Sequence, residues 1–146
     1  LEPGRAPWVG ERASVVNAIN VPRGIQDHIP LIVGGNGRKK TAGLAVKHAD
    51  ELNFVFLSPD EVAERMVEVR AKCEAAGRDP ESLRFSVYTL DEDYLEPGRA
   101  RVDRIRAYAD VGVDRIVCFP TKKAPTLETQ ERFAEDCVAA GIGLAP

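Results

Sequence analysis

Four short apolar runs alternate with four helical patterns after about residue 30, and this alternation restricts the possible folds more than any other feature. The runs are rich in β-branched and aromatic residues and have the length of buried strands; they span 31–34, 52–57, 84–89 and 115–119. Apolar residues recur at one-face helical spacing at 42–49, 62–76, 102–109 and 127–141. Strands alternating with helices pair in parallel through right-handed crossovers, so the sequence predicts an α/β fold.

The 146 residues fit a single domain of ordinary size. We divide them into an irregular entry segment, 1–29, with a short edge strand near 13–16, and four βα units over 30–146. Capping signals support the helix boundaries. Ser58 precedes Pro59 and stands three residues before Glu61, which predicts an N-cap with a capping box.

Composition excludes several classes of partner. Twenty cations against 23 anions leave a net charge of −3, too small to indicate a nucleic acid or a membrane surface as partner. No apolar run is long enough to span a bilayer, and no signal peptide is visible at Leu1, although the chain does not begin with Met. The cysteines at 73, 118 and 137 are far apart, so we expect buried thiols and a cytoplasmic location. No histidine or acidic cluster predicts a metal site.

A glycine-rich turn follows the first apolar run, and three cations follow the turn. Gly34, Gly35, Asn36 and Gly37 lead into Arg38, Lys39 and Lys40, and we expect the first helix to begin near Gly37 or Arg38. A strand-to-helix turn of this kind directs free backbone N–H groups outward at the positive end of the helix dipole. One interpretation is a seat for a phosphate; the other is a tight turn that needs glycine for geometry alone, followed by a solvated basic face. The spacing matches neither the Rossmann nor the Walker motif.

Several segments, in order, resemble the luciferase-like monooxygenase family. They are IPLIVGGNGRKKTAGLAVKHADELN, SPDEVAERMVEVRAKCEAAGRDPESLRFSV and YADVGVDRIVCFP, and the resemblance covers roughly residues 8–142. It is greatest to the branch that uses the deazaflavin coenzyme F-420, with FMN users as the alternative. The family fold is an eight-stranded β/α barrel, and this chain resembles its C-terminal half.

A complete barrel needs at least ~200 residues, so the chain is expected to form half of a TIM barrel with about four βα units. Such a half has two unpaired strand edges and an apolar inner face open to water. We therefore expect it to be completed by a second copy, as a homo-oligomer, or by a missing N-terminal half.

Function in β/α barrels is located at the C-terminal ends of the strands. The resemblance implies that Gly34, Gly35, Asn36 and Gly37 hold the phosphate or ribityl part of the cofactor. Thr121 and Lys122 follow the last strand, where barrels often bind phosphate, and Ser58 follows the second. Ser58 has a second interpretation as a helix cap alone, and Lys122 as part of a solvated loop. The acid–base residues of the family lie largely on the first four strands, so no catalytic residue is identified.

We expect part of a flavin- or deazaflavin-dependent oxidoreductase, acting by hydride transfer or monooxygenation on a small-molecule substrate. The cofactor would be coenzyme F-420, or alternatively FMN. Two other functions remain open: a non-catalytic half-barrel that binds a cofactor or another subunit, and an unrelated phosphate-binding β/α domain.

Overall fold

A parallel four-stranded sheet forms the centre of the molecule. The computed structural model describes residues 6–18, 24–89, 96–119 and 124–143. The sheet order is β3-β4-β5-β6, and a helix follows each strand, which confirms the predicted α/β fold of four βα units. The strands are β3 (Ile32–Gly34), β4 (Glu51–Val55), β5 (Arg84–Thr89) and β6 (Arg115–Cys118). The helices are α1 (Lys40–His48), α2 (Pro59–Ala75), α3 (Arg99–Asp110) and α4 (Leu127–Ala139).

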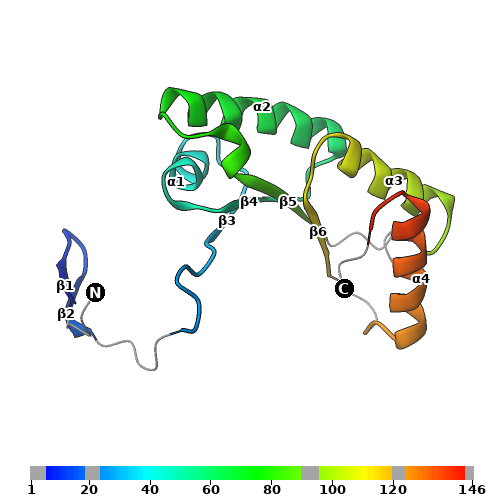
Figure 1. Cartoon of the computed structure of the whole chain (residues 1–146), viewed down its shortest axis with the longest axis horizontal. Helices are drawn as coiled ribbons and strands as arrows, with labels where there is room; N and C mark the ends of the chain where they lie inside the picture. Colours follow the sequence, from blue (N-terminus) through cyan, green and yellow to red (C-terminus); the bar gives the residue numbers. More distant parts are fainter. Residues whose placement is uncertain (1–5, 19–23, 90–95, 120–123, 144–146) are drawn as a thin grey trace.

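The helices cover one face of the curved sheet. Figure 1 shows α1 and α2 over β3, β4 and β5, with α3 and α4 beside β6. Alternate strand residues point toward these helices, and the rings of Phe54 and Phe85 stack there with centroids 6.0 Å apart. Val62, Met66 and Cys73 of α2 complete this core, each at most 1% exposed. Burial of this apolar stripe is the main stabilisation of the half-barrel.

The opposite sheet face carries a polar network at the starts of the strands, beside exposed apolar side chains such as Ile32 and Val117. Glu51 of β4 accepts a hydrogen bond from Ser86 Oγ at 2.5 Å, and Asn53 Nδ2 donates to the same hydroxyl at 2.7 Å. Arg115 of β6 donates to Glu51 as well. Burial raises the pKa of the Glu51 carboxyl, but the hydrogen bonds from Ser86 and Arg115 outweigh it and the net pKa is lowered. Glu51 and Arg115 begin their strands, at the end of a β/α barrel that serves stability.

The helix boundaries follow the predicted caps with one exception. Ser58 caps α2 and forms the expected capping box with Glu61, and Pro59 is the first residue of the helix. The first helix was expected to begin near residue 37 or 38 but begins at Lys40. Gly35 has φ 123°, a conformation that interrupts a helix, so the chain makes a wider turn before α1.

A separate hairpin precedes the parallel sheet. The strand expected near 13–16 is present as β2 (Ser14–Ala18), which pairs antiparallel with β1 (Ala6–Val9). The two form their own sheet, and Figure 1 shows the hairpin apart from the four βα units. The division at residue 30 stays a prediction. Within the described ranges, the helices are too short or too polar to cross a membrane.

Candidate functional site

The turn between β3 and α1 lies at the C-terminal end of the sheet, as predicted. Gly34 is the last residue of β3 and pairs with Asn53 of β4. The next amide, that of Gly35, donates to the Asn53 carbonyl at 2.9 Å, and so extends the strand pairing by one bond. This N–H is therefore directed into the protein and not toward a ligand. The predicted anion seat is thus restricted to the residues on either side of Gly35.

Asn36 fastens the turn to the neighbouring strand. Its Nδ2 donates to the Val55 carbonyl at 2.7 Å, and its Oδ1 accepts from the Val55 N–H at 2.9 Å. The side-chain amide thus continues the sheet as a backbone group would. The sequence places Asn36 in the predicted cofactor-binding turn, and in the structure its side-chain amide has a bidentate structural role.

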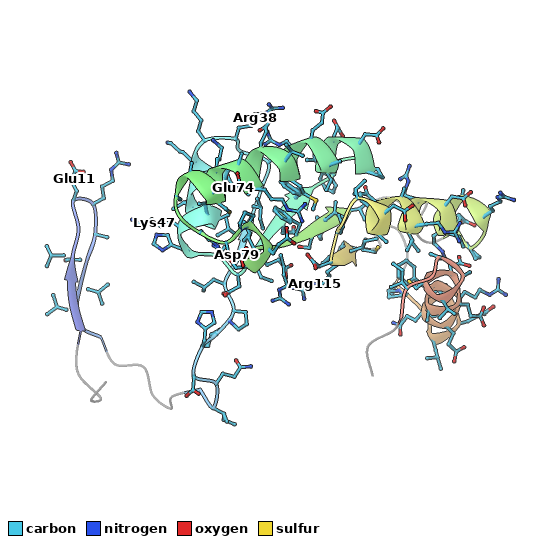
Figure 2. All side chains as sticks on the ribbon, turned by 45° about the horizontal axis from the view of Figure 1, so that its top comes forward. Glu11, Arg38, Lys47, Glu74, Asp79 and Arg115 are labelled. Atoms are coloured by element: carbon cyan, nitrogen blue, oxygen red, sulfur yellow. The ribbon has the colours of Figure 1, made fainter. Side chains whose placement is uncertain are left out.

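A buried guanidinium supports the same turn from behind. Arg65 of α2 has a side chain only 10% exposed, and it donates to the Asn36 carbonyl. Glu68 accepts from Arg65 at 3.3 Å and from Arg38 at 2.5 Å, so one carboxylate joins two cations. In Figure 2 Arg38 lies above the ribbon of α2 and Arg115 below it. Sequence periodicity did not identify Arg65, because its partner is 29 residues away.

The glycines of the turn are required for different reasons. Gly35 has φ 123°, which other residues rarely adopt. A Cβ on Gly37 would lie 2.6 Å from Thr41 Oγ1, so this position has no room for a side chain. A Cβ on Gly34 would meet nothing within 4 Å. Gly34 is thus the position where the missing side chain leaves open space that another molecule can occupy.

The start of α1 differs in charge from the starts of α2 and α4. Those two helices have capping boxes and an acidic residue in the first turn. α1 has neither a side-chain cap nor an acidic residue there. Lys39 and Lys40 are exposed beside it, and Arg38 has a side chain 64% exposed. The local charge suits an anion.

The remaining predicted positions are less informative. Ser58 Oγ donates to Glu61 Oε2 at 2.9 Å, and its backbone N–H donates to the same oxygen at 2.8 Å. The backbone N–H and the hydroxyl of Ser58, both of which donate to this carboxylate, lower the pKa of Glu61. Thr121 and Lys122 lie outside the described residues. Among the residues that are described, no group of His, Cys, Asp or Glu could hold a metal ion.

A cavity of about 520 Å³ lies beside the ends of β4 and β5. Phe56, Ser58, Thr89, Arg104 and Tyr108 are among its lining residues. Tyr108 Oη donates to the Leu57 carbonyl at 2.6 Å, which fixes the segment after β4 to α3. Sequence reasoning missed Phe56, because a phenylalanine in an apolar run has the pattern of a core residue.

Comparisons with known proteins agree with this fold. The family model described as luciferase-like monooxygenase matches residues 4–90, which include the glycine turn and β3, β4 and β5. A solved structure, an F-420-dependent secondary alcohol dehydrogenase in complex with an F-420-acetone adduct, superimposes with a TM-score of 0.73 at 16% identity. The match covers 94% of this chain and 56% of that chain, so this chain spans little more than half of its neighbour's length. None of the curated proteins matches. Since the family model covers more than half of the sequence, the chain belongs to the luciferase-like monooxygenase family.

Proposed function

We propose that this chain is part of a flavin- or deazaflavin-dependent oxidoreductase and contributes the side of the site that holds the cofactor's phosphate tail. The observation that carries the proposal is membership of the luciferase-like family through a segment that contains the glycine turn. The cofactor we favour is coenzyme F-420, because the structural neighbour is described with it, and FMN is the alternative.

The residues around the turn suit such a tail. Open space at Gly34 lets a ligand approach the backbone closely, and Arg38, Lys39 and Lys40 supply positive charge. Arg65 and Asn36 hold the turn in place, so little order must be gained on binding. Thr121, Lys122 and Ser58 remain proposed contacts. When bound, the cofactor would supply hydride transfer or oxygen activation, and the protein would position it.

The acid–base groups of the reaction would come from another half of the barrel. β3 and β6 are the edges of the four-stranded sheet, and parallel edges require a partner strand. A second copy or an N-terminal half would supply it. This chain spans 56% of its structural neighbour. That partial coverage favours a second candidate function, a half-barrel that binds the cofactor but does not convert a substrate by itself.

Titration with FMN and with coenzyme F-420, followed by fluorescence, tests the proposal. We expect saturable binding to the chain and an affinity several-fold weaker in Gly34→Ala, whose Cβ fills the open space. Gly43→Ala is a matched control, because Gly43 lies on α1 and a Cβ there also meets nothing within 4 Å. If neither cofactor binds, or if both variants behave alike, the proposed site is wrong. Reduction of the bound cofactor by small alcohols separates the catalytic from the non-catalytic candidate.

A further inference from the structure

Phe56 has an unfavourable backbone conformation at the functional end of the sheet. Among the described residues it is the one non-glycine residue with a positive φ, at 57°. The left-handed region is unfavourable for a bulky side chain, and such strain persists where the surrounding structure or a function requires it. Phe56 directly follows Val55, whose backbone N–H and carbonyl are both hydrogen-bonded to the side chain of Asn36.

Packing of the ring does not explain this strain. Phe56 is 56% exposed, whereas Phe54, two residues earlier and within β4, is 1% exposed with ordinary strand geometry. Burial therefore stabilises Phe54 and contributes much less at Phe56. A chain that only needed a turn here would be served better by glycine, which adopts positive φ without strain.

The conformation places Phe56 beside a second ring. The Phe56 and Tyr88 centroids are 5.9 Å apart with the rings inclined at 44°. The Phe56 N–H donates to the Tyr88 carbonyl at 2.9 Å, so both residues sit at the same level at the ends of β4 and β5. Phe56 also lines the cavity of about 520 Å³. An exposed ring that packs against a half-buried one, next to a cavity, is a surface on which a flat ring can stack.

We propose that Phe56, supported by Tyr88, is a stacking platform for the flat conjugated ring of the flavin-type cofactor. This proposal rests on the proposed function. That function assigns a binding site to the phosphate tail of the cofactor, and this proposal assigns one to its ring. The two sites are neighbours, because the hydrogen bonds between Asn36 and Val55 join the glycine turn to the residue before Phe56. A flat ring gains affinity by stacking without any directional polar partner.

The decisive variant is Phe56→Gly, because it separates stability from binding. Glycine relieves the strain, so the urea midpoint should rise or stay unchanged. Affinity for FMN and for coenzyme F-420 should nevertheless fall roughly tenfold, since the stacking ring is gone. Phe56→Tyr keeps a ring and should bind as the parent does. Leu44→Ala removes another exposed apolar side chain, on α1, and should leave binding unchanged.

Lumichrome, the tricyclic alloxazine that remains when a flavin loses its ribityl phosphate tail, separates the platform from the anion seat. We expect it to bind the parent chain and to bind Phe56→Gly roughly tenfold more weakly. If lumichrome binds Phe56→Gly as well as the parent, or does not bind the parent, the platform is rejected. If the platform result holds but FMN binds no more tightly than lumichrome, the platform stands and the proposed phosphate seat fails.

Discussion

The side chain of Asn36 and the backbone of Val55 form a closed pair of hydrogen bonds across the end of the sheet, at 2.7 and 2.9 Å. The two residues are 19 positions apart and belong to different βα units. The pair converts a glycine-rich turn, which would otherwise have many conformations, into a fixed extension of β3 alongside β4. It also joins the proposed phosphate seat to the proposed ring platform.

Asn36→Ala should therefore lower both stability and cofactor affinity. Removal of the amide leaves the Val55 N–H and carbonyl without these partners, at a cost of about 1–2 kcal/mol in the free energy of unfolding. Asn36→Asp keeps the acceptor and loses the donor, so its free energy of unfolding should lie between those of the parent and the alanine variant. Urea unfolding followed by circular dichroism measures the first effect, and FMN titration the second. An alanine variant as stable as the parent would show that the pair is not formed in solution.

Ser58 has an observed role as a helix cap and a proposed contact with the cofactor, and substitution can separate the two. Its hydroxyl caps α2, and loss of a serine cap costs about 1 kcal/mol, so Ser58→Ala should be destabilised by that amount. Ser58→Asp retains a capping oxygen but places a second carboxylate beside Glu61, so its stability should lie between those of the alanine variant and the parent, and its charge would repel a phosphate. If Ser58 contacts the cofactor as the sequence predicts, both variants bind FMN more weakly. Unchanged affinity in the aspartate variant would restrict Ser58 to capping.

Much of the fold could be predicted from the sequence because its determinants are local. The strand predicted at 84–89 is observed as β5 with the same bounds, and the capping box at Ser58 follows from residues three positions apart. Gly77 has φ 72° after α2, as expected of a C-cap glycine. Periodicity, caps and turn residues all act within a few positions, so they can be read along the chain.

The details of the site could not be predicted because they depend on distant partners. Phe56 has a positive φ directly after β4, and no local sequence pattern predicts this conformation. The support of Asn36 by Arg65 joins residues 29 positions apart. An arginine within a charged helix reads as a solvated residue, yet Arg65 is 8% exposed. Long-range hydrogen bonds of this kind become visible only in three dimensions.

The buried carboxylate of Glu51 should make stability depend on pH. Its pKa is lowered from 4.5 in the folded state, because the hydrogen bonds from Ser86 and Arg115 outweigh the opposing effect of burial. A lowered folded pKa contributes stability that is present above the unfolded value and is lost as pH falls through the folded value. Glu51→Gln should be less stable at pH 7, because Arg115 loses its charged partner, and should lose less stability below about pH 4.5.

Urea midpoints measured from pH 7 to pH 3 check this prediction for Glu51. Glu74→Gln, an exposed change on α2, is the control and should follow the curve of the parent. Parallel curves for Glu51→Gln and the parent would show that the carboxylate does not contribute to acid unfolding.

The three thiols should react slowly in the folded chain. Burial and, to a smaller extent, the neighbouring Cys137 together raise the pKa of Cys118 to about 12. Burial also raises the pKa of Cys73 and of Cys137. Because the thiolate is the reactive form, Ellman's reagent at pH 8 should modify the native chain far more slowly than the chain in urea. Rapid modification of even one thiol under native conditions would mean that the packing between β6 and α4, or beneath α2, opens readily in solution.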